Sequence, residues 1–72
     1  QGLEIVTAID SCLDRLAAIN PHIRTLVELR IFEGLTIDEA SARLGVSSRT
    51  AARYWAFAQE WLAVELGGVP AA

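Results

Sequence analysis

The sequence is poor in the residues that build disulfides, metal sites and membrane spans. Its 72 residues include no methionine, one cysteine (Cys12) and one histidine (His22). A single cysteine excludes an internal disulfide, and one cysteine with one histidine argues against a metal site. No apolar run approaches the roughly 20 residues that cross a membrane, and no segment has the pattern of a signal peptide. We therefore expect a chain without cofactors or membrane contact, in the reducing cytoplasm.

An initiator methionine and catalytic groupings are also absent. Because residue 1 is Gln1, we expect the sequence to be a piece of a longer protein. No pair of carboxylates, serine–histidine set or phosphate-binding loop suggests catalysis, so we expect no enzymatic activity. The hydrophobic content of 53% nevertheless indicates one small globular domain rather than a disordered chain. At this length the helices must pack well for the domain to be stable.

The charge of the chain is unevenly distributed. The formal net charge is −3, which by itself argues against a nucleic-acid partner. The window 40–59 contains three arginines (Arg43, Arg49 and Arg53) and no acidic residue, so this window carries +3 and the rest of the chain −6. Local charge governs contact with phosphates more than total charge does, so we expect the positive potential to lie in this window.

The hydrophobic periodicity predicts an all-α domain of four helices, at about residues 3–18, 21–33, 37–44 and 48–66. Asn20 and Pro21 are typical of a helix start, and Gly34 is typical of a helix end. We expect residues 1–66 to form the domain and residues 67–72 to be a flexible tail. The expected core residues of the first two helices are Ile5, Ile9, Cys12 or Leu13, Leu16, Ile23, Leu26, Val27 and Phe32.

Residues 35–62 have the pattern of a helix-turn-helix, the motif that places a helix in the DNA major groove. Thr36 and Glu39 have the spacing of a capping box, which begins a short helix. Gly45 is expected to end that helix, because only glycine adopts the left-handed conformation at little cost. Ser47 is a good N-cap for the second, longer helix. These signals predict a C-terminal helix-turn-helix that binds DNA.

The spacing of the last helix gives it two faces. The face expected toward the core contains Ala51, Trp55, Ala58 and Leu62, extended by Trp61 and Leu66. The opposite face contains Ser48, Arg49, Ala52, Arg53 and Ala56. Arginine can bind guanine through two hydrogen bonds, and alanine can contact a thymine methyl group. The hydroxyls of Ser47 and Ser48, with the free N–H groups of the first turn, could hold a DNA phosphate.

Four short segments carry a resemblance to a known family. They are residues 16–21 (LAAINP), 27–30 (VELR), 33–36 (EGLT) and 44–47 (LGVS). Through them, residues 15–62 resemble region 4, the C-terminal domain of bacterial RNA polymerase sigma factors, and most closely the extracytoplasmic-function (ECF) type. In such sigma factors this domain binds the −35 promoter element and contacts the flap of the polymerase β subunit. It is also a common target of anti-sigma factors.

The resemblance implies roles for particular residues. Arg30 and Thr36 match positions near the phosphate backbone, and the first two helices match surfaces that polymerase or an anti-sigma factor would use. The positions that match contacts in the −35 major groove are Ser48, Arg49, Thr50, Ala52 and Arg53. The resemblance thus implies a function in transcription initiation, with promoter DNA and the RNA polymerase core as partners.

The last helix departs from the family pattern, and two alternatives stay open. Ala52 stands where the family often has lysine or arginine, and Gln59 and Glu60 stand where basic residues are frequent. Fewer cations release fewer counterions, so we expect weaker DNA binding. One alternative is the DNA-binding domain of a response-regulator-type activator, which would dimerise on two half-sites. The other is a protein-interaction module with little DNA binding, and exposed apolar surface would let the isolated fragment dimerise.

Overall fold

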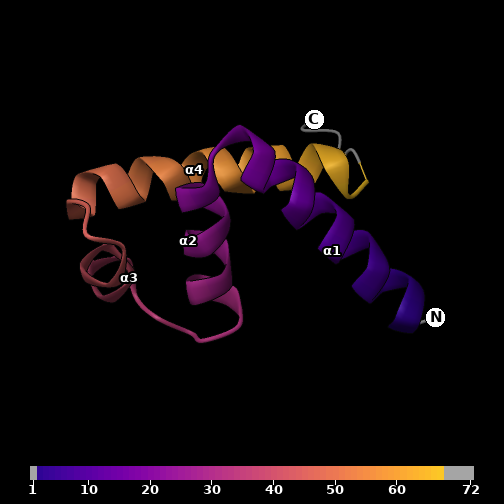
Figure 1. Cartoon of the computed structure of the whole chain (residues 1–72), viewed down its shortest axis with the longest axis horizontal. Helices are drawn as coiled ribbons and strands as arrows, with labels where there is room; N and C mark the ends of the chain where they lie inside the picture. Colours follow the sequence, from indigo (N-terminus) through magenta and orange to yellow (C-terminus); the bar gives the residue numbers. More distant parts are fainter. Residues whose placement is uncertain (1, 68–72) are drawn as a thin grey trace.

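The fold consists of helices joined by short connections (Figure 1). A computed structural model describes residues 2–67, and the side chains of residues 8–67. These residues form four helices and no strand, which confirms the predicted all-α fold. The predicted burial of Ile5 and the predicted tail beyond Gly67 lie outside the described parts. The helices are α1 (Gly2–Ile19), α2 (Pro21–Ile31), α3 (Ile37–Leu44) and α4 (Ser48–Glu65).

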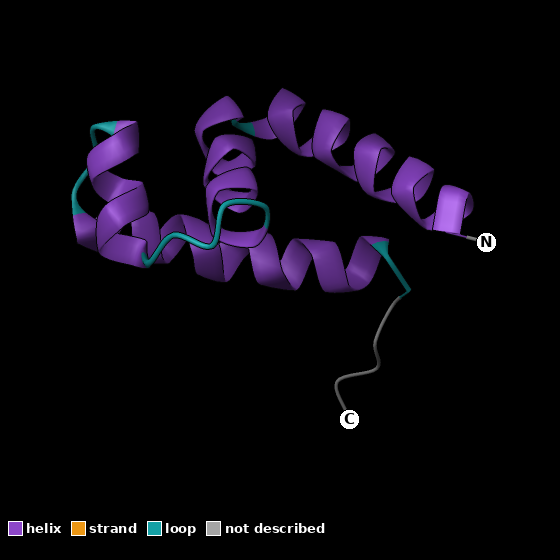
Figure 2. Ribbon diagram, turned by 90° about the horizontal axis from the view of Figure 1, so that it is seen from below, coloured by secondary structure: helices purple, strands orange, loops and turns teal. Residues whose placement is uncertain are grey.

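Helix α2 lies at the centre of the fold and packs against each of the other three helices (Figure 1). Helix α3 packs against both α2 and α4, whereas α1 packs mainly against α2. The N-terminal end of α1 and the C-terminal end of α4 lie on the same side of α2 in both views, and α3 lies on the other side (Figures 1 and 2). Helices α3 and α1 are therefore placed on opposite sides of α2, and α4 extends along both sides.

The starts of α2 and α3 follow the predicted capping signals. Oδ1 of Asn20 accepts a hydrogen bond from the N–H of His22 at 2.9 Å, and Pro21 occupies the first turn of α2. At the start of α3 the Thr36 hydroxyl accepts from the N–H of Glu39 at 3.1 Å, while the Glu39 carboxylate accepts from the N–H of Thr36 at 2.9 Å. This reciprocal pair is the predicted capping box, and it satisfies two backbone donors that the helix leaves free.

The tight turn between α3 and α4 depends on Gly45. Its φ is 76°, in the left-handed region that a side chain makes costly. The N–H of Val46 donates to the carbonyl oxygen of Ser41 at 3.1 Å, and the N–H of Gly45 donates to that of Ala42 at 3.3 Å. This is the Schellman arrangement of a helix end. The chain therefore reverses within a few residues, which gives the predicted helix-turn-helix.

Two clusters of buried apolar side chains hold the helices together. The first cluster joins α1, α2 and the C-terminal half of α4, and it contains Leu13, Leu16, Ile23, Val27 and Ala58. The second cluster joins α2, α3 and the N-terminal half of α4, and it contains Leu26, Leu29, Ala40 and Ala51. Tyr54 and Trp55 are half-buried and pack against both clusters. These two residues connect the two parts of the core.

The end of α2 differs from the prediction, and so does the position of Phe32. The helix ends at Ile31 rather than at residue 33. Gly34 follows with a φ of 70°, and the N–H of Leu35 donates to the carbonyl oxygen of Leu29 at 3.0 Å. This turn leaves the Phe32 side chain 63% exposed, so its predicted place in the core is wrong. Leu29, which was not predicted, is buried instead.

The described residues contain neither a membrane-crossing helix nor a metal-binding cluster. Over this part of the chain, no helix combines the length and the hydrophobicity that crossing a bilayer requires. Within the same residues, no three histidine, cysteine or acidic side chains are grouped so that they could hold a metal ion.

Candidate nucleic-acid interface

Helix α4 has an exposed face along its N-terminal half. The residues exposed on this face are Ser48, Arg49, Ala52, Arg53 and Ala56. On the opposite side, Ala51 and Ala58 are fully buried, and Trp55 and Leu62 pack half-buried against the first core cluster. The predicted division of the helix into a core face and an exposed face is confirmed.

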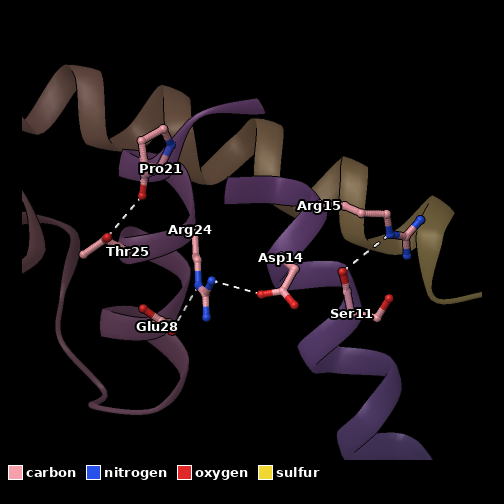
Figure 3. Close-up of polar contacts among 7 residues, drawn as sticks. All are labelled: Ser11, Asp14, Arg15, Pro21, Arg24, Thr25 and Glu28. Atoms are coloured by element: carbon pink, nitrogen blue, oxygen red, sulfur yellow. Dashed lines mark hydrogen bonds and ion pairs between the residues drawn. The ribbon is translucent and has the colours of Figure 1, made fainter. Parts of the chain in front are cut away.

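Two arginines of the first two helices, Arg15 and Arg24, form ion pairs within the chain. Arg24 on α2 donates to Asp14 on α1 at 3.2 Å and to Glu28, one turn further along α2, at 3.4 Å (Figure 3). Arg15 on α1 pairs with Glu65 near the end of α4. These ion pairs neutralise acidic side chains and connect α1 to α2 and to α4.

Arg49 and Arg53 differ from those arginines, because neither forms a salt bridge with any residue that the structure describes. They lie four residues apart, so one helical turn separates them on the exposed face of α4. Arg43 on α3 has a partner, since its Nη1 lies 3.7 Å from the carboxylate of Glu33. The exposed face of α4 therefore offers two guanidinium groups that are free to bind phosphates or base edges.

The hydroxyl groups at the start of α4 are already engaged within the chain. Ser47 Oγ accepts from the N–H of Thr50 at 3.0 Å and donates to Thr50 Oγ1 at 3.1 Å, so Ser47 is the predicted N-cap. Ser48 Oγ donates to Oδ1 of Asp38 at 2.6 Å. A carboxylate that sequence reasoning did not select therefore lies at the N-terminal end of α4.

Arg30 lies between helices rather than on the exposed face of α4. Its Nη1 donates to the carbonyl oxygen of Leu35 at 2.7 Å. Its guanidinium carbon lies 4.8 Å from the centroid of the Trp55 ring, a distance typical of a cation–π contact. These contacts join the end of α2, the connection to α3 and the middle of α4. Arg30 therefore has a structural role, and its contact with a DNA phosphate stays a prediction.

Replacing Arg30 with lysine is expected to lower the free energy of unfolding by about 1–2 kcal/mol. A lysine ammonium cannot lie flat on the Trp55 ring and also donate to the Leu35 carbonyl as the planar guanidinium does. Urea unfolding followed by circular dichroism measures the change. Arg43→Lys is the matched control, because Arg43 is 59% exposed and its loose ion pair contributes little. Equal stabilities of the two variants would contradict the structural role of Arg30.

Comparison with protein families covers nearly the whole chain. A family model described as ECF sigma factor matches residues 2–68. The chain belongs to the ECF sigma factor family. No significant match to a curated protein or to a solved structure was found. Membership gives the chain a role in transcription initiation with RNA polymerase and promoter DNA as partners, and it favours this role over the response-regulator alternative.

The predicted DNA-contacting residues of this ECF sigma factor fall into two groups. Thr36 lies at the start of α3, with its hydroxyl engaged in the capping box, and Arg30 lies on α2 against Trp55. The other six are brought together in and just before the first two turns of α4, and they are Ser47, Ser48, Arg49, Thr50, Ala52 and Arg53. Their contacts with DNA stay predictions.

The sigma factor also has an apolar groove that sequence reasoning missed. It lies between α1, α2 and α4, and the described side chains that line it are all apolar. Phe32 and Leu66 on its rim are 63% and 50% exposed, although their spacing predicted core positions. Periodicity identified these side chains as apolar, but it could not show that α2 and α4 end beside them. The residues that line the groove are Ile9, Leu13, Val27, Ile31, Phe32, Leu62 and Leu66.

Proposed function

We propose that this ECF sigma factor recognises the −35 promoter element by placing the N-terminal half of α4 in the major groove. The observation that carries the proposal is a pair of exposed arginines, Arg49 and Arg53, on the second helix of a helix-turn-helix, neither of which forms a salt bridge with a residue in the described part of the chain. Helix α3 would cross the DNA backbone beside them, as the first helix of this motif does. Sequence-specific DNA binding follows from this placement.

The spacing of the α4 side chains suits neighbouring base pairs. With a rise of about 1.5 Å per residue, the backbone positions of Arg49 and Arg53 lie about 6 Å apart along the helix axis. This separation is close to that of two base-pair steps of about 3.4 Å each. Each guanidinium can bind O6 and N7 of a guanine. Ala52 lies between them on the same face, where a methyl group can approach a thymine methyl. The small side chain also lets the helix come close to the base edges.

Backbone contacts and the polymerase are proposed to supply most of the affinity. Thr36, Ser47 and Thr50 lie near the starts of α3 and α4, where free N–H groups and helix dipoles favour phosphate. Few cations remain for the DNA, because Ala52, Gln59 and Glu60 replace basic side chains of the family pattern. Binding to DNA in the cytoplasm is therefore expected to depend on the polymerase that holds the domain in place.

The apolar groove between α1, α2 and α4 is proposed to dock the flap of the polymerase β subunit. Among the described side chains its lining is apolar, and Phe32 on its rim is too exposed for a side chain that serves only the core. An anti-sigma factor that covered the same groove would compete with the polymerase. Dimerisation of the isolated fragment through this groove would be a consequence of leaving it uncovered.

Binding to two duplexes tests the proposed DNA recognition. One contains the −35 element of the promoter of the protein's own gene, and the other has the same composition in scrambled order. We expect preference for the promoter duplex and an affinity that falls as salt rises from about 50 to about 200 mM. Fluorescence anisotropy at both salt concentrations measures this. Strong but equal binding to the two duplexes would overturn the proposed sequence recognition. Equal, negligible binding would favour either the protein-interaction alternative, which the net charge of −3 and the apolar groove support, or recognition that works only when the polymerase holds the domain in place.

A further inference from the structure

A carboxylate joins the first turns of the two helices of the helix-turn-helix. Asp38 lies in the first turn of α3, and its Oδ1 accepts a hydrogen bond from Ser48 Oγ, in the first turn of α4, at 2.6 Å. Ser41 supports the arrangement, since its Oγ donates to the Asp38 carbonyl oxygen at 2.8 Å and lies 3.4 Å from Ser48 Oγ. The position of the carboxylate is therefore fixed from both helices.

The place that Asp38 occupies is one that favours an anion. The free N–H groups and the dipole of a helix N-terminus attract negative charge, and DNA phosphates commonly bind there. Asp38 forms no salt bridge with any residue that the structure describes, so no cation of the chain neutralises it. Its side chain is also exposed. A full negative charge thus lies at the end of α4 that would face the DNA.

We propose that Asp38 sets the DNA affinity of this domain by holding its carboxylate where a DNA phosphate would otherwise approach the first turn of α4. This inference rests on the proposed DNA-binding function. The carboxylate repels the phosphate backbone whatever the base sequence, so it weakens binding to all duplexes by the same factor. Free copies of the protein then spend little time on DNA, and lasting occupancy requires the polymerase to hold the domain at the promoter.

Replacing Asp38 with asparagine tests the proposal, because the amide keeps the shape and the oxygen that accepts from Ser48. We expect Asp38→Asn to tighten binding to the promoter and scrambled duplexes alike by roughly fivefold at low salt. The dependence of affinity on salt is expected to steepen by about one ion if a phosphate then approaches the first turn of α4. Asp10→Asn is the matched control, because Asp10 is an exposed acid on α1. The control is expected to change affinity by less than about twofold, since salt screens distant charges.

The possible outcomes test the role of Asp38 separately from the proposed promoter recognition. Equal affinities of Asp38→Asn and Asp10→Asn, weaker binding by Asp38→Asn, or no detectable binding by any variant at low salt would overturn the role of Asp38. Equal binding of the unmodified protein to promoter and scrambled DNA would instead overturn the proposed promoter recognition, while tighter binding of Asp38→Asn to both duplexes would still support the role of Asp38. Asp38→Ser is a second neutral variant that suits the first turn of a helix, and thermal unfolding confirms that each variant is folded.

Discussion

Replacing Arg49 and Arg53 together with alanine is expected to lower the affinity for the −35 duplex by about 30-fold or more. Each arginine that binds a base through two hydrogen bonds contributes about 1–3 kcal/mol of discrimination, so Arg53→Ala alone costs about that amount. The double variant loses the preference for promoter over scrambled DNA. Both side chains are exposed and lack ion pairs within the described residues, so the fold tolerates their removal.

Arg43→Ala separates base contact from a general loss of positive charge. It removes one cation from the same helix-turn-helix, but its side chain is paired with Glu33 and lies on α3. We expect Arg43→Ala to weaken binding to both duplexes slightly and by the same factor, as a phosphate-attracting charge does. If Arg53→Ala behaves in the same way as Arg43→Ala, Arg53 attracts the backbone and reads no base. Unchanged affinity would remove Arg53 from the interface.

Replacing Leu26 with alanine is expected to lower the free energy of unfolding by about 2–5 kcal/mol. Leu26 is fully buried, and it belongs to the cluster that joins α2 to α3 and to the N-terminal half of α4. A domain of 72 residues has a total stability of roughly 4–11 kcal/mol. The cavity left by this single substitution therefore removes a large share of the stability, because the two alanines in the cluster cannot expand to fill it.

Urea unfolding followed by circular dichroism measures this loss. Val64→Ala is the control, since Val64 is 68% exposed near the end of α4 and its truncation is expected to change stability by less than about 0.5 kcal/mol. If Leu26→Ala unfolds at the same urea concentration as Val64→Ala, the second cluster does not hold α3 in place.

Helix boundaries were predictable where a local signal sets them. Thr36, Gly45 and Ser47 act through hydrogen bonds and dihedral angles of their immediate neighbours, and the bounds of α3 match the predicted 37–44. The end of α2 was less predictable. Phe32 fits the helical spacing of the core, but the helix ends at Ile31. The chain turns there, and the N–H of Leu35 donates a hydrogen bond to the carbonyl oxygen of Leu29. Periodicity records which side chains are apolar, not where the backbone leaves the helix.

The exposed face of α4 was also predictable, because four-residue spacing places Arg49 and Arg53 on one side whatever the helix packs against. The partners of the polar side chains were not. Ser48 meets Asp38, ten residues earlier, only because of how α3 and α4 cross. Arg30 meets Trp55, on another helix, for the same kind of reason. Such contacts depend on tertiary packing, which a helical pattern does not contain.

The division of the core into two clusters has a consequence for how the protein can diverge. The helix-turn-helix is stabilised by one cluster, whereas the apolar groove shares Leu13 and Val27 with the other. Tyr54 and Trp55 are the half-buried residues that pack against both. Substitutions at one end can therefore accumulate over generations without loosening the other end, provided that these two aromatic residues persist. Under the proposed roles of α4 and the groove, descendants of one ancestral gene can change the DNA sequence they bind while keeping the same protein partner, or change the partner while keeping the DNA sequence.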